Sequence, residues 1–152
     1  MPSIDTKHFG MLTYDPARVL TFPAGLPGYP TYTQYTLLSD ETSDGTFYWL
    51  QSVEDGEIVF TLMDVYRVLP DYNPLVDPEE LGDLGDITEG SLEIYNVAVI
   101  PEDIQDMRVN LRAPVVINNH TKLGKQMICL SEEYPIRYMI AQELQATRNG
   151  VV

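Results

Sequence analysis

Short apolar and β-branched runs recur along the chain, and turn residues separate almost all of them. The run 107–111 alternates apolar with polar positions, which is typical of a half-buried strand, and 46–50 is rich in strand-forming residues. The pattern predicts strands at 4–14, 18–22, 36–38, 46–53, 57–63, 92–100, 107–111, 115–118 and 126–130. Strands this short and numerous indicate an all-β fold.

A helical spacing of apolar residues is sustained only near the C-terminus. Ile136, Met139, Ile140 and Leu144 would share one face, so residues 134–145 are expected to form a short helix. One or two helical turns are also expected at 78–81. The eleven prolines are spread widely and exclude long helices. The 152 residues fit a single domain, 1–152, and we expect a compact antiparallel barrel or sandwich with short helical turns.

Residues 22–29, Phe-Pro-Ala-Gly-Leu-Pro-Gly-Tyr, form the conformationally most restricted stretch. Proline fixes φ and glycine reaches positive φ without steric cost, so the backbone can reverse twice within this run. Its three large side chains, Phe22, Leu26 and Tyr29, would then face either a core or a partner. A buried strand connection and a recognition turn are both compatible with this pattern.

The net charge of −14 is unevenly distributed. Residues 40–106 contain 18 acidic residues and one basic residue, a charge of −17, whereas the rest of the chain has five acidic and eight basic residues, a charge of +3. A negative field of this kind repels phosphate, which argues against direct binding of nucleic acid or of an anionic membrane. It would attract a basic protein partner, and it would equally keep a protein soluble.

The ends and the cysteine content indicate a cytoplasmic protein. The N-terminus has no basic region followed by an apolar run, and no window approaches the roughly 20 apolar residues of a membrane span. The single cysteine, Cys129, lies in an apolar run and is expected to be a small buried side chain.

Residues with catalytic or metal-binding chemistry are few. His8 and His120 both lie in polar surroundings, and the stretch 118–122 around His120 is typical of a hairpin turn. The sequence contains no nucleophile elbow, phosphate-binding loop, zinc-binding helix or zinc-spaced cysteine pair. Carboxylates recur at three-residue intervals at Asp77, Glu80, Asp83, Asp86 and Glu89. Their spacing differs from that of an EF-hand calcium loop, so we expect no metal, no cofactor and no enzyme activity.

Four stretches together resemble a known family. They are the run 22–29, Leu50-Gln51-Ser52, Pro70-Asp71-Tyr72-Asn73-Pro74, and 110–118 followed by 123–126, which indicates a strand, a turn and a strand. In this order and at these spacings they resemble the bacterial flagellar assembly factor FliW over nearly the whole chain. The resemblance implies an all-β, small antiparallel β-barrel-like domain, in agreement with the predicted strands.

The resemblance also implies a non-enzymatic cytoplasmic regulator that binds newly made flagellin and, alternatively, the RNA-binding translational repressor CsrA. When flagellin is scarce, such a protein sequesters CsrA and relieves the repression of flagellin mRNA. When flagellin accumulates in the cell, it occupies the regulator and CsrA is released. In this family the antagonism of CsrA is allosteric rather than a covering of its RNA site. We expect the free protein to be a monomer.

Physical reasoning assigns the two partners to different residues. Charge complementarity would bring a basic RNA-binding protein to the acidic segment. The candidates for CsrA contact are Asp71, Asp77, Glu79, Glu80, Asp83 and Asp86. The terminal regions of flagellin form amphipathic helices, by the same resemblance, and such helices need an apolar groove. The candidates for that groove are Phe22, Leu26, Tyr29, Pro114 and Ile117.

Alternative interpretations stay open from the sequence. The acidic residues could belong to a solvated loop, and Phe22 and Ile117 could belong to the core. A small-ligand-binding barrel would need an unfilled interior. An enzyme would need His8 or His120 in a concave site beside a carboxylate with a perturbed pKa.

Overall fold

The computed structural model describes residues 1–148, which form eleven strands and two short helices. The strands are β1 Ser3–Thr6, β2 Gly10–Thr13, β3 Leu20–Thr21, β4 Gln34–Ser39, β5 Phe47–Ser52, β6 Val59–Met63, β7 Leu92–Val99, β8 Arg108–Val109, β9 Val115–Asn118, β10 Leu123–Gln126 and β11 Tyr138–Met139. The helices are α1 Pro78–Gly82 and α2 Ala141–Arg148, and the 3-10 turns are η1 Pro16–Arg18, η2 Glu41–Ser43, η3 Val65–Arg67 and η4 Ile104–Asp106.

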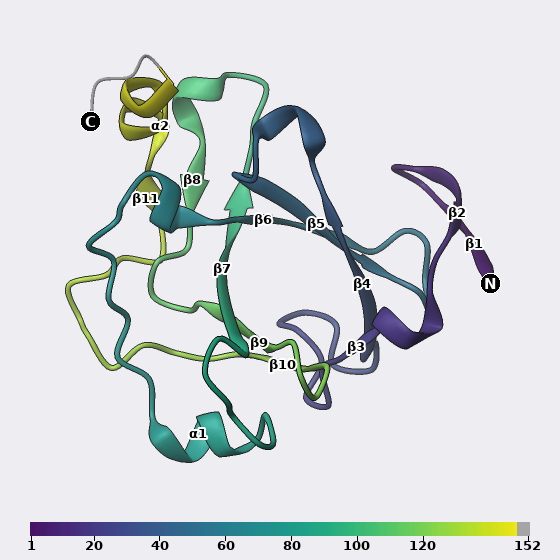
Figure 1. Ribbon diagram of the computed structural model, residues 1–152. Coiled ribbons are helices and arrows are strands. Elements are labelled where there is room, and N and C mark those ends of the chain that lie inside the picture. The colour runs from purple at the N-terminus through teal and green to yellow at the C-terminus, as the bar shows by residue number, and fades with distance from the viewer. Residues whose placement is uncertain (149–152) are drawn as a thin grey trace.

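Seven of the strands close into a barrel (Figure 1). The hydrogen-bonded order runs β7, β6, β5, β4, β3, β10 and β9, and β9 pairs again with β7. The pairing of β3 with β10 is parallel and the other pairings in the ring are antiparallel. The β1–β2 hairpin projects from one side of the barrel, and β8 and β11 extend the sheet beyond β7. The predicted all-β barrel is confirmed.

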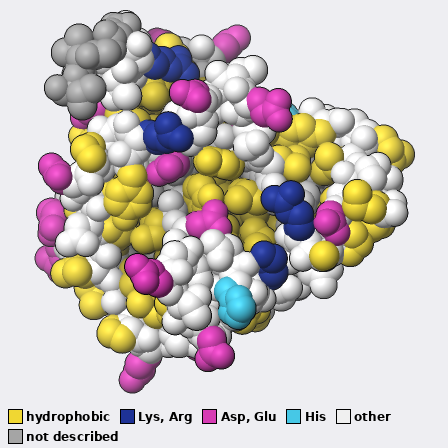
Figure 2. Space-filling view, in the orientation of Figure 1, with side chains coloured by type: hydrophobic (Ala, Val, Ile, Leu, Met, Phe, Trp, Pro, Cys, Tyr) yellow, Lys and Arg dark blue, Asp and Glu magenta, His cyan; other side chains and the backbone are white. Residues whose placement is uncertain are grey.

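Side chains from alternate strand positions fill the interior of this barrel. Tyr35 of β4, Leu50 of β5 and Leu62 of β6 point inward and are 0% exposed. Phe47 and Met63, at odd spacing from those positions, point outward into a second apolar cluster that includes α2 residues. Side chains accordingly occupy the opening that is seen between the ribbons of Figure 1 (Figure 2). The filled centre contradicts the unfilled interior that a ligand-binding barrel would need.

Most predicted strands differ from the observed ones by a few residues at their ends, and two differ more. The run 4–14 is a hairpin, because residues 7–9 form a turn between β1 and β2. The strand predicted at 126–130 is wrong, because β10 spans Leu123–Gln126 and shares only Gln126 with that range. Residues 127–130 then leave the ladder and run along the segment 112–114, where the N–H groups of Met127 and Cys129 donate to Pro114 O and Arg112 O at 2.9 and 2.7 Å. The prediction that Cys129 is buried is confirmed.

The C-terminal helix begins later than the apolar spacing predicts. Residues 138–139 form β11 and pair with β8, so α2 starts only at Ala141. Ile140 and Leu144 keep the predicted four-residue spacing and are buried, whereas Ile136 and Met139 precede the helix and are 60% and 51% exposed. The helical turn predicted at 78–81 is α1. Neither helix among residues 1–148 has the length and apolar character needed to cross a membrane.

Candidate functional site

The turn formed by residues 22–29 lies over the end of the barrel at which β7 and β10 finish and β9 begins. Gly25 and Gly28 have φ angles of +67° and +89°, so both glycines adopt the predicted left-handed backbone. The Gly25 N–H donates to Phe22 O at 2.7 Å, and a Cβ at Gly25 would approach Tyr29 O to 2.6 Å. The turn is therefore tightly closed, and its Leu26 side chain is buried in the core.

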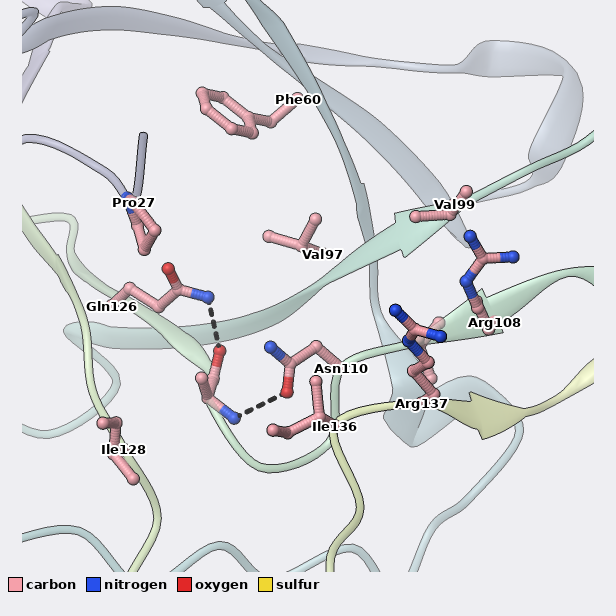
Figure 3. A pocket seen from close by; sticks show the side chains of 12 residues that line it. Pro27, Phe60, Val97, Val99, Arg108, Asn110, Gln126, Ile128, Ile136 and Arg137 are labelled. Carbon is pink, nitrogen blue, oxygen red and sulfur yellow. Dashed lines mark hydrogen bonds between the residues drawn. The ribbon is translucent and has the colours of Figure 1, made fainter. Parts of the chain in front are cut away.

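An apolar groove of about 560 Å³ opens beside this turn (Figure 3). We call it the barrel-mouth groove, and it is lined by Pro27, Phe60, Val97, Val99, Arg108, Val109, Asn110, Ala113, Gln126, Ile128, Ile136 and Arg137. These residues come from five segments: the turn, β6, β7, β8 with the connection to β9, and the end of β10 with the chain that follows it. The groove thus exists only in the folded barrel.

Exposed aliphatic side chains border the groove, and hydrogen bonds to the backbone fix two side-chain amides in its wall. Ile128 and Ile136 are 68% and 60% exposed, a strong exposure for such side chains. The Gln126 Nε2 donates to Ala113 O at 3.0 Å, and the Asn110 Oδ1 accepts from Ala113 N at 3.0 Å. Because backbone groups hold both amides, this wall is preorganised around an apolar surface that water covers in the free protein.

None of the five predicted flagellin-contact residues lines this groove. Phe22, Leu26 and Ile117 are 0%, 3% and 1% exposed and pack together in the barrel interior. Pro114 is buried as well. Tyr29 is 39% exposed and lies with its ring centroid 5.9 Å from that of Phe60, which lines the groove. The assignment of the 22–29 turn to the site stays a prediction, but Tyr29 is the member of the set that a partner can reach directly.

Sequence reasoning missed Ile128, Ile136, Arg108 and Arg137. The sequence predicted a strand at 126–130 with Cys129 buried, and in the structure the neighbouring Ile128 and Leu130 are exposed. The sequence did carry a usable signal. Consecutive apolar residues in an extended segment point to both of its faces, and each face then needs a core or a partner to cover it. The arginines gave no local signal.

The predicted CsrA-contact residues lie on a loop that is firmly anchored. Asp77 caps α1 by accepting from the Glu79 N–H at 2.9 Å. Leu84 is 1% exposed and packs in an apolar cluster with Val116 and Met127. The acidic segment 71–86 is therefore held against the barrel, and Figure 2 shows acidic side chains along the rim near α1.

A buried asparagine fixes this acidic segment to the β9–β10 turn. The Asn118 Nδ2 donates to Leu84 O and Asp86 O at 3.0 and 2.9 Å, and its Oδ1 accepts from the N–H groups of His120 and Thr121. The side chain is 0% exposed, so all of its hydrogen-bonding capacity serves this junction.

The six acidic candidates have different surroundings. Glu80 and Asp83 both pair with Lys125, at 3.3 and 2.9 Å. Within residues 1–148, Asp71, Glu79 and Asp86 have exposed carboxylates that form no ion pair. A cationic partner would find these three available without breaking an existing pair.

Both histidines lie in turns between strands. His8 lies in the β1–β2 turn with its ring 5.5 Å from that of Trp49, and His120 is exposed in the predicted β9–β10 turn. Across the described part of the chain, no three His, Cys, Asp or Glu side chains are grouped so that they could hold a metal ion.

Comparison with known proteins bears on this architecture. The FliW protein family matches residues 3–140. The chain belongs to the FliW family. A FliW from Alkaliphilus metalliredigens, named flagellar assembly factor, is 36% identical over 142 residues, which cover 93% of this chain and 88% of that protein. The FliW from Thermoanaerobacter pseudethanolicus, with the same name, is 35% identical and the match covers 93% and 95% of the two chains.

A solved structure agrees with the fold. The crystal structure of a flagellar assembly factor FliW superposes with a TM-score of 0.84 at 30% identity, covering 91% of this chain and 96% of that one. The FliW resemblance stated from the sequence is therefore confirmed.

Two of the stretches that carried the FliW resemblance build the scaffold. The Gln51 Nε2 donates to Ser52 O and Ile58 O, and the Ser52 Oγ accepts from two N–H groups of the β5–β6 turn. The Tyr72 hydroxyl donates to Leu111 O at 2.6 Å and accepts from the Asn96 Nδ2 at 3.0 Å. Burial raises the pKa of the Tyr72 phenol, which stays a hydrogen-bond donor at neutral pH. These two stretches thus position strands of the barrel.

Proposed function

We propose that this FliW family member acts in flagellar assembly, where it binds flagellin in the cytoplasm and, alternatively, CsrA. In this scheme it antagonises CsrA allosterically while flagellin is scarce and releases CsrA when flagellin accumulates. In this way the protein couples flagellin translation to flagellin secretion and assembly. Family membership over residues 3–140 is the observation that supports the assembly role.

The barrel-mouth groove supports the flagellin half of this proposal. An amphipathic helix presents apolar side chains every three or four residues, and it binds by inserting them into an apolar groove. The volume of about 560 Å³ and the exposed Ile128 and Ile136 fit such side chains. Flagellin helices that are unpaired before assembly would lose apolar surface to water on binding, which also gives the interaction a chaperone character.

The acidic segment 71–86 supports the CsrA half. Its anchored backbone holds the exposed carboxylates of Asp71, Glu79 and Asp86 in place, so a basic partner meets a preorganised negative surface. The groove and the acidic segment lie on different parts of the barrel surface. We propose that occupation of one surface disfavours binding at the other, because the two partners are alternatives.

The test is titration calorimetry of the purified protein against flagellin and CsrA from the same species, first separately and then in competition. We expect binding to both and displacement of CsrA by flagellin. Binding to flagellin alone would reduce the function to chaperoning, and binding to neither would contradict the proposal.

A further inference from the structure

Two arginines at the barrel-mouth groove have no carboxylate partner in the described chain. Arg108 and Arg137 both line the groove, and neither guanidinium forms an ion pair or a hydrogen bond among residues 1–148. Figure 3 shows both guanidinium groups on the same side of the groove, away from Pro27. Most basic residues in the described chain form no ion pair, and what distinguishes Arg108 and Arg137 is that both line one groove.

The fold does not need this pair of charges. Arg112, which lies nearby in the sequence, donates to Tyr134 O and Glu132 O and holds two loops together. Arg108 and Arg137 have no such task, and two cations placed side by side repel each other. Their arrangement is favourable once an anion lies between them, because a carboxylate accepts paired hydrogen bonds from guanidinium groups.

Apolar surface continues on both sides of the arginines. Cross-strand register places Val99, Arg108 and Met139 opposite one another on β7, β8 and β11, so the three side chains share one outward face. Val99 and Met139 are 44% and 51% exposed. On the groove side, Ile128 and Ile136 continue the apolar surface. The arginines therefore interrupt an apolar track rather than mark its end.

We propose that Arg108 and Arg137 form a carboxylate-binding subsite within the barrel-mouth groove, which selects a docked apolar segment that carries an Asp or Glu side chain on its binding face. A side chain is required rather than a chain terminus, because the apolar track runs on past the arginines and the bound segment must continue with it. The proposal rests on the proposed function, with flagellin as the protein that supplies the segment.

The subsite would select the direction and register of the bound helix as well as its identity. A purely apolar helix can slide by one turn or reverse in an apolar groove at little cost, since aliphatic side chains of similar size replace one another. One acidic side chain held by two guanidinium groups allows a single placement. A helix with a Lys at that position would be rejected by like-charge repulsion.

The experiment measures the affinity of same-species flagellin for Arg108→Gln, Arg137→Gln and the double variant at low and high salt. Arg18→Gln is the matched control, because Arg18 is exposed at the opposite mouth of the barrel and has no ion pair in the described chain. We expect the double variant to bind flagellin at least about 10-fold more weakly at low salt, with a flatter salt dependence, and the control to match the wild type. Melting temperatures should stay at the wild-type value.

A double-mutant cycle identifies the partner carboxylate. Single Asp→Asn and Glu→Gln substitutions in the terminal regions of flagellin are combined with the double arginine variant. One of them should weaken binding to the wild type and have no further effect on the variant. If the wild type binds flagellin and the arginine variants bind it equally well, the subsite is refuted while the proposed function stands. If the wild type does not bind flagellin, the flagellin half of the function fails and the subsite with it.

Discussion

At the scale of single residues, the centre of the barrel contains one polar atom that its surroundings do not satisfy. Tyr35 is 0% exposed and packs edge-on against Phe22 with 5.5 Å between ring centroids. Its hydroxyl oxygen is buried and has no hydrogen-bond partner among the described residues. An unsatisfied buried hydroxyl costs stability that a ring without it would not lose.

We predict that Tyr35→Phe stabilises the protein by about 1 kcal/mol at pH 7. Burial raises the pKa of the Tyr35 phenol to about 12, so the folded state holds a proton that the unfolded state releases above about pH 10. The wild type should therefore lose stability as pH rises from 10 towards 12, and the variant should lose less. Urea unfolding at pH 7, 10 and 11 measures both effects.

The control for this prediction is Tyr14→Phe, which changes a tyrosine that is only partly buried. That variant should keep the wild-type stability at pH 7. A Tyr35→Phe protein that is less stable than the wild type at pH 7 would mean that the hydroxyl has a partner in solution.

At the scale of secondary structure, one hairpin holds the acidic segment in place. Two hydrogen bonds of the Asn118 side chain join the β9–β10 turn to residues 84 and 86, and two more hold the turn itself. We predict that Asn118→Ala lowers the free energy of unfolding by about 2–4 kcal/mol, because four hydrogen bonds of a buried side chain are lost. Limited proteolysis should then cut first within residues 83–90.

Asn119→Ala is the matched control for the hairpin. The Asn119 side chain makes a single weak bond to Gly90 O at 3.3 Å and is partly exposed, so its loss should change stability by less than about 0.5 kcal/mol. Equal unfolding curves for the two variants would contradict the anchoring role of Asn118.

Secondary structure was predictable wherever the pattern is local. The alternation at 107–111 predicted correctly that Met107, Val109 and Leu111 are buried. The C-terminal helix was predicted too early, because residues 138–139 gain backbone hydrogen bonds from β8 that a helix at that point would forgo. The helical spacing involved only four apolar residues, and strand pairing in the folded protein outweighed it.

At the scale of the whole molecule, the closure of the barrel and the formation of the barrel-mouth groove depend on contacts that no local pattern encodes. The parallel pairing of Thr21 with Leu123 closes the barrel across about a hundred residues of chain. The groove then combines side chains from five separate segments. The assignment of the 22–29 turn to a binding site stays a prediction, and no local pattern placed Ile128 or Arg137 beside Pro27 of that turn.

Charge asymmetry is also a property of the whole molecule, and it yields the last prediction. Residues 40–106 carry −17, and the exposed carboxylates of Glu79 and Asp86 belong to this field. Reversing both, as Glu79→Lys with Asp86→Lys, should slow association with CsrA about 10-fold at low salt and flatten its salt dependence. Glu80 and Asp83 are poorer choices, since their reversal would also break the pairs with Lys125.

The control for the last prediction separates local from global charge. Asp5→Lys with Glu132→Lys produces the same net charge from two exposed residues outside the segment 40–106. Stopped-flow association across a salt series compares the two variants. A slower rate for Glu79→Lys with Asp86→Lys alone would locate the docking surface on the acidic segment. Equal slowing of both would mean that net charge steers CsrA without a defined site, and unchanged rates for both would remove electrostatic steering from the mechanism.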